Sequence, residues 1–133
     1  MNHSAIVSEA ILRTFESPTG GVVGLVDDLL ASCPKHGLRL AWEAERCWVF
    51  LASENGREMS FVVQLRKSVL RAILARFAAL CNGRMSNAVS PYGGEGTFSP
   101  ATEPTKTFRV KFVNTPAEQS LELRSEATVP AVA

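Results

Sequence analysis

The sequence is poor in the residues from which most catalytic and metal sites are built. It contains only two histidines and three cysteines among its 133 residues. It has no G-x-S-x-G, H-E-x-x-H, Walker or G-x-G-x-x-G motif, and it has no suggestive pair of carboxylates. An odd number of cysteines forms no complete disulfide framework, so we expect free thiols and a cytoplasmic protein. These absences favour a protein without catalytic activity and without a cofactor.

Long apolar runs and an excess of one charge are missing as well. The longest candidate run, 69–81, is interrupted by Arg71 and Arg76, and no run approaches the roughly 18 apolar residues that a membrane helix needs. We therefore expect no membrane association, and the N-terminus lacks the features of a signal peptide. The net charge of +1 gives no electrostatic preference for nucleic acid or for an acidic partner.

The length of the chain fits one domain with a proper core. We predict a single domain over residues 1–125 and a flexible C-terminal tail over 126–133, which shows no periodicity. Apolar residues at helical spacing predict helices over 4–16, 22–33 and 69–81, with Ser68 as the N-cap of the third helix.

Strands are indicated by alternating or continuous apolar residues. These patterns predict strands over 38–43, 47–52, 59–65, 107–112 and 121–124. The resulting element order is α-α-β-β-β-α-loop-β-β. We therefore predict an α+β fold: a single domain with an antiparallel sheet of about five strands and helices packed mainly on one face.

The dipeptide Asn55-Gly56 predicts a two-residue hairpin turn between the second and third strands. A turn of this length pairs Phe50 with Phe61 and Trp48 with Val63. The predicted register therefore places these four residues on one face of the hairpin. The other apolar residues of the second strand lie on the opposite face.

The first hairpin leaves two alternatives open. A two-residue loop at Ala44-Glu45 pairs Trp42 with Cys47 and makes the sheet apolar on both faces, whereas a three-residue loop places Trp42 beside Trp48. The first alternative requires a cover for the second face. That cover is either the N-terminal helix or a partner chain.

The segment from Asn82 to Pro104 is predicted to be a long glycine-rich loop. Loops of this length are usually functional or disordered. We expect Tyr92 to Phe98 to be accessible and to become ordered on a partner, with both aromatic residues as anchors. The alternative is a connection whose aromatic residues pack back on the domain. The candidate binding residues are Tyr92, Gly93, Gly94, Glu95, Gly96 and Phe98, together with Arg66, Arg71 and Arg84.

Cys33 and His36 are the only thiol and imidazole close together in the sequence. With Cys47 and Cys81 they could supply four zinc ligands, but zinc sites usually show two close pairs on loops. Cys47 lies in an apolar strand pattern and Cys81 at the core edge of a helix pattern. We therefore predict structural thiols and no bound metal.

Three functional hypotheses follow in order of preference. The first is a non-catalytic module that binds a macromolecular partner, either another protein or a second copy of the chain, in an accessory, regulatory or oligomer-forming role. The second is a ligand- or nucleic-acid-binding domain that uses the loop 90–100 and nearby arginines, Arg109 included. The third is an enzyme of an unrecognised type.

Overall fold

The protein forms a single α+β domain in the computed structural model, which describes residues 3–16, 20–34, 36–52, 57–83, 89–101 and 104–126. Two helices come first, three strands follow, and a third helix leads into three more strands. The elements are α1 (His3–Glu16), α2 (Gly21–Ala31), β1 (Leu38–Glu43), β2 (Arg46–Ala52), β3 (Glu58–Val63), α3 (Lys67–Cys81), β4 (Gly93–Phe98), β5 (Thr107–Asn114) and β6 (Gln119–Glu126).

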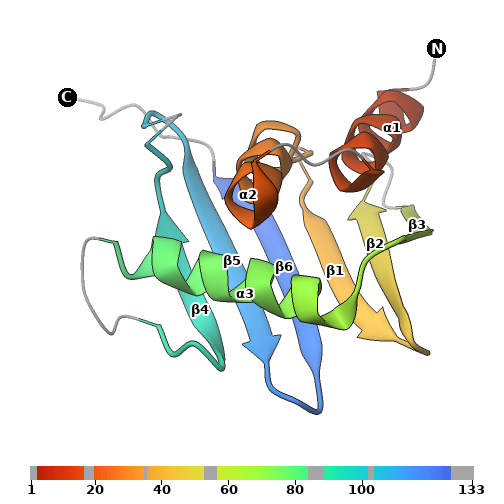
Figure 1. The fold of residues 1–133 in the computed structure, drawn as a ribbon. Coiled ribbons are helices and arrows are strands. Elements are labelled where there is room, and N and C mark those ends of the chain that lie inside the picture. The colour runs from red at the N-terminus through yellow and green to blue at the C-terminus, as the bar shows by residue number, and fades with distance from the viewer. Residues whose placement is uncertain are drawn as a thin grey trace.

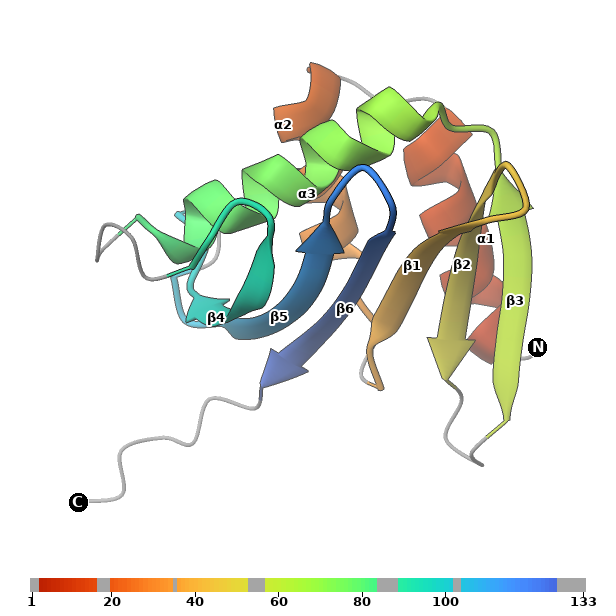
Figure 2. The same cartoon turned by 90° about the horizontal axis from the view of Figure 1, so that it is seen from below.

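The six strands form one antiparallel sheet in the order β3-β2-β1-β6-β5-β4. All three helices lie on the same face of this sheet (Figure 1). The view in Figure 2 shows the sheet curving beneath the helices, with β3 and β4 at its two edges. The predicted fold class is therefore confirmed, with one strand more than the sequence indicated.

The core lies between the sheet and the helices. Ile11 and Phe15 of α1 are buried in it, as are Leu25 of α2 and Phe77 of α3. Apolar spacing predicted the positions of the helices, but not every apolar residue on them is buried, since Val23 of α2 is 48% exposed. The predicted cap of α3 is wrong, because the helix begins at Lys67 with Arg66 at the N-cap position and no side-chain capping hydrogen bond. No helix within the described residues is long and apolar enough to span a membrane.

The first hairpin adopts the shorter of the two predicted loops. Trp42 pairs with Cys47, and Ala44 and Glu45 both have positive φ, 52° and 62°. Positive φ at both central residues is typical of a type I′ turn, whose twist matches that of the flanking strands. Trp42 therefore packs against the core on the helix side of the sheet.

The predicted register of the second hairpin is wrong by one residue. Phe61 pairs with Val49 and Ser60 pairs with Phe50, so Phe61 and Val63 lie on the core face. A shift of one residue moves every side chain to the other face. Trp48 and Phe50 consequently point away from the helices. The Asn55-Gly56 dipeptide itself lies outside the described residues.

The predicted loop from Asn82 to Pro104 contains the edge strand β4, which is a correction to the sequence interpretation. Gly93 to Phe98 pair with Val113 to Phe108 of β5. Gly93 and Gly94 have φ of 152° and 153°, values that glycine accommodates far better than other residues. Residues 84–88 and 102–103 lie outside the described part of the chain. At the C-terminus β6 includes Glu126, so the sheet runs one residue into the predicted tail.

Candidate functional site

The two aromatic residues predicted as partner anchors occupy different environments. Tyr92 is 65% exposed, as expected for an accessible anchor. Phe98 is only 8% exposed, and its ring lies 6.1 Å from Phe77 and 5.8 Å from Phe108. The expectation that Phe98 is accessible is therefore wrong, because its side chain belongs to the core. A role for Tyr92 in binding stays a prediction.

Gly96 of β4 allows the sheet to pack closely against α3. A Cβ atom on Gly96 would lie 2.8 Å from Val89 Cγ2 and 2.9 Å from Cys81 Sγ, which is closer than real Cβ atoms come. Glycine at position 96 thus allows the edge strand to approach the end of α3. The backbone from Gly93 to Gly96 is used in pairing with β5, so these residues form a strand rather than a phosphate-binding turn.

The predicted arginines do not gather into one site. Arg71 is half-buried, and its Nε donates a hydrogen bond to Asn114 Oδ1 at 3.0 Å. The backbone N–H of Asn114 donates to the carbonyl oxygen of Tyr92 at 2.8 Å, so Arg71 and Tyr92 approach the same asparagine. Arg66 is exposed at the N-cap of α3. Arg84 lies outside the described residues.

The three cysteines lie apart in the structure. Cys47 is fully buried in β2, and burial raises the pKa of its thiol to about 12. Cys33 follows α2, where burial likewise raises its pKa to about 12 and its thiol donates to the carbonyl oxygen of Pro34. Burial also raises the pKa of Cys81. Among the described residues no three potential metal ligands come together. The absence of bound zinc stays a prediction.

The strongest candidate site lies on the face of the sheet opposite the helices, which we call the open face. Its aromatic cluster consists of Trp48 and Phe50 of β2, with ring centroids 6.4 Å apart and stacked at 26°, and Arg39 of β1. The Arg39 guanidinium carbon lies 3.9 Å from the centre of the Phe50 ring. Such a cation–π contact is worth about 0.5–1 kcal/mol at an exposed position.

A weak ion pair also helps to orient the Arg39 side chain. Its Nη2 atom lies 3.5 Å from Oε1 of Glu58 in β3. Both side chains remain substantially exposed, so the pair contributes little to stability. Arg39 therefore spans two strands of the open face, with its planar head accessible to a partner.

Two hollows flank the aromatic cluster, and Arg39 lines both. The larger, about 540 Å³, lies where β1 ends its pairing with β6 at Ala41, and it extends to the β5–β6 turn. The smaller, about 180 Å³, lies at the other end of β1 and includes Phe50 and Glu58. The surface is thus a centre of aromatic residues and Arg39 between two hollows.

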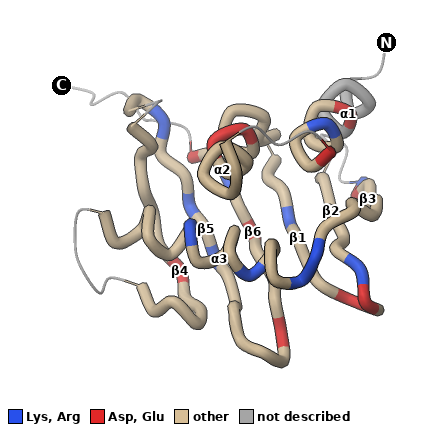
Figure 3. Tube along the Cα trace, viewed as in Figure 1, with Lys and Arg blue, Asp and Glu red and all other residues tan. Residues whose placement is uncertain are grey.

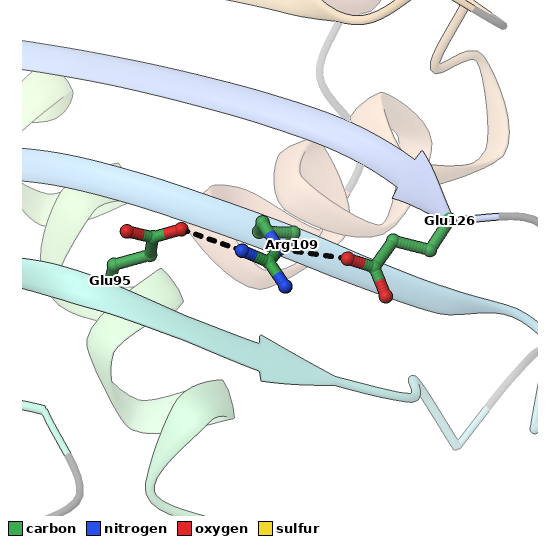
Figure 4. Close-up of polar contacts among 3 residues, drawn as sticks. All are labelled: Glu95, Arg109 and Glu126. Carbon is green, nitrogen blue, oxygen red and sulfur yellow. Dashed lines mark hydrogen bonds and ion pairs between the residues drawn. The ribbon is translucent and has the colours of Figure 1, made fainter.

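The rest of the open face carries charges of both signs. Glu95 and Glu126 both accept hydrogen bonds from Arg109, at 2.9 Å and 2.8 Å (Figure 4). The bond to Glu126, with that to Glu95, raises the pKa of Arg109. Figure 3 shows basic and acidic residues interspersed along the strands. By strand register, the charged open-face residues are Arg39, Arg46, Arg109, Lys111 and Arg124, and Glu43, Glu58, Glu95, Glu122 and Glu126.

Sequence reasoning did not identify the aromatic cluster as a site. The sequence did contain an indication of it, because a two-residue loop in the first hairpin makes both faces of the sheet apolar near Trp48. The error in the second hairpin then assigned Trp48 and Phe50 to the same face as Phe61 and Val63. With the observed register, these two large aromatics stand on a face that no described helix covers.

The chain matches no protein-family model, and no curated protein is significantly similar to it in sequence. A function therefore has to be inferred from its own residues and their arrangement.

Proposed function

We propose that this protein is a non-catalytic binding module whose open face holds another polypeptide. The observation that carries the proposal is the stacked pair Trp48 and Phe50, with Arg39 beside it, on a face that none of the described helices covers. Tryptophan and arginine are the residues most enriched among the energetic centres of protein interfaces. Stacked aromatics of this size lose accessible apolar surface when a partner arrives, and this loss favours binding.

The N-terminal helix lies on the side of the sheet that carries Trp42 and Cys47, opposite the aromatic cluster. Ile11 and Phe15 of α1 are buried in the core, and the helix lies against the helix side of β3. None of the described helices covers the aromatic cluster, so its accessible surface is available to a partner chain.

The charges of the open face favour a polypeptide over nucleic acid. Basic and acidic side chains occur there in equal numbers, and Arg39 and Arg109 both have carboxylate neighbours. Nucleic-acid binding depends on an excess of positive charge that displaces counterions from phosphates. A rim of mixed charges around an aromatic centre is instead the usual anatomy of a protein interface, and it gives specificity and orientation.

Photocrosslinking in the native host tests the proposal without knowledge of the partner. One variant of the full chain carries benzoyl-phenylalanine in place of the half-buried Trp48, and a control variant carries it in place of Tyr92, which is 65% exposed. We expect position 48 to form a covalent adduct with a polypeptide, and Arg39→Glu to reduce its yield. Position 92 should form little of that adduct.

Three outcomes contradict the proposal. A nuclease-sensitive adduct at position 48 favours the nucleic-acid alternative. An adduct at position 92 without one at position 48 places binding at the start of β4 instead. Absence of any adduct at position 48, in a variant whose circular dichroism matches that of the wild type, leaves the open face without a partner.

A further inference from the structure

Strand β3 forms one edge of the sheet and lacks the features that usually protect an edge. No strand of the described chain lies beyond it, and Figure 2 shows it at the outer side of the sheet. Its residues, EMSFVV, include no proline or lysine, and their pairing with β2 is continuous without a bulge. The only charge is Glu58 at the start. An exposed apolar edge of this kind readily pairs with a strand of another chain.

The opposite edge is built differently. In β4, three of the six residues are glycines, and the charged Glu95 stands in the middle of the strand. Glycine weakens strand pairing because it costs more backbone entropy and offers no side chain to pack. The two edges of the same sheet therefore differ, and β3 is the one suited to pairing.

An apolar hollow lies directly beside the β3 edge. Its volume is about 360 Å³, and it is lined by Glu9 and Leu12 of α1 and by four residues of β3, Met59 to Val62. Met59 is 38% exposed, which is unusual for a large side chain on the core face of a strand. The edge thus offers backbone groups for pairing and a hollow for an apolar side chain.

We propose that the β3 strands of two copies of this chain pair antiparallel across a two-fold axis and extend the sheet. An axis perpendicular to the sheet keeps the helices of both copies on the same side. Pairing centred on Ser60 satisfies this condition and places Met59 of each copy beside Phe61 of the other, at the α1 hollow. Because such an interface is isologous, both hollows are filled by the same contact.

The charge pattern of β3 does not oppose its pairing with a second copy. Centred on Ser60, the pairing sets Glu58 opposite Val62 of the second copy, so no like charges of the two β3 strands face each other across the seam. The small Ser60 side chains of the two copies meet at the two-fold axis, on the open face. Cross-strand contacts of this kind stabilise a sheet by about 0.2–1 kcal/mol per pair.

The dimer would also enlarge the proposed binding surface. Trp48 and Phe50 lie in β2, the strand next to the seam, so the two aromatic clusters share one continuous open face. The dimer does not require the proposed function, since the contacts that form it belong to β3 and α1.

A charge exchange at Ser60 tests the pairing with the full-length chain. We expect the wild type to sediment as a dimer in analytical ultracentrifugation, and Ser60→Lys and Ser60→Glu each to sediment as monomers, because like charges then meet at the axis. An equal mixture of the two variants should restore the dimer. Thr97→Lys, an exposed open-face position of β4, is the matched control and should remain dimeric.

A disulfide provides an independent readout should the charged variants fail to fold. Directly opposed residues in antiparallel strands have Cα atoms about 4.5–5.5 Å apart, within the range a disulfide spans. Oxidised Ser60→Cys should therefore run as a covalent dimer, and Thr97→Cys should not. A monomeric wild type at every concentration, a dimer unaffected by Ser60→Lys, or equal crosslinking by the two cysteine variants overturns the proposal.

Discussion

Replacement of Phe98 by alanine distinguishes a sheet strand from a binding loop. The Phe98 side chain is 8% exposed and packs between the rings of Phe77 and Phe108. Truncation of a buried phenylalanine costs about 3–5 kcal/mol, and we expect about 3 kcal/mol here because β4 is an edge strand that can partly relax. At about 2.1 cal/mol/K of unfolding entropy per residue, that loss lowers the melting temperature by roughly 10 °C. Urea denaturation followed by circular dichroism measures it.

Tyr92→Ala is the matched control for this experiment. Tyr92 is 65% exposed and lies only six residues before Phe98. Its truncation should change the free energy of unfolding by less than about 0.5 kcal/mol, as for most surface positions. If Phe98→Ala costs as little as Tyr92→Ala, then β4 does not pack on the core and the segment is a loop.

Further predictions concern packing, hydrogen bonding and pH. Gly96→Ala should destabilise the protein by about 1–3 kcal/mol, because the new Cβ meets Val89 Cγ2 at 2.8 Å; thermal melting measures this. Asn114→Ala should cost about 1–3 kcal/mol in urea denaturation, because the buried amide both accepts from and donates to Arg71. The raised pKa of Cys47, about 12, means that its stabilising contribution is present below the ordinary thiol pKa of 9.0 and is lost as pH rises toward 12. Iodoacetamide at pH 9.0 should therefore modify Cys47 only as fast as the protein unfolds, which mass spectrometry can follow.

Helix positions could be predicted from the sequence, and the first hairpin could be reduced to two alternatives. Apolar spacing located all three helices because packing against the core imposes that spacing, although Val23 of α2 is exposed. The pairing of Trp42 with Cys47 was one of only two alternatives, and the positive φ of Ala44 and Glu45 selects it. No sequence rule marks alanine and glutamate as residues for such a turn, so the choice required the structure.

The register of β3 and the existence of β4 could not be predicted from the sequence, for different reasons. Trp48 and Phe50 are apolar on one face of β2, and Val49 and Leu51 are apolar on the other, so hydrophobicity could not choose between the two registers. In β4 the glycines hide the strand pattern, since glycine is depleted in strands. Position 96 needs glycine because a larger side chain would collide with Val89 and Cys81, and only the tertiary structure reveals that these residues lie there.

Hydroxyl-radical footprinting in cells tests the functional account most directly. Trp48 and Tyr92 are both reactive aromatics, but only Trp48 lies in the aromatic cluster of the open face. We predict that Trp48 is oxidised more slowly in cells than in the isolated protein, whereas Tyr92 is oxidised at the same relative rate in both. Equal oxidation of Trp48 in cells and in isolation would contradict the claim that the open face holds a partner.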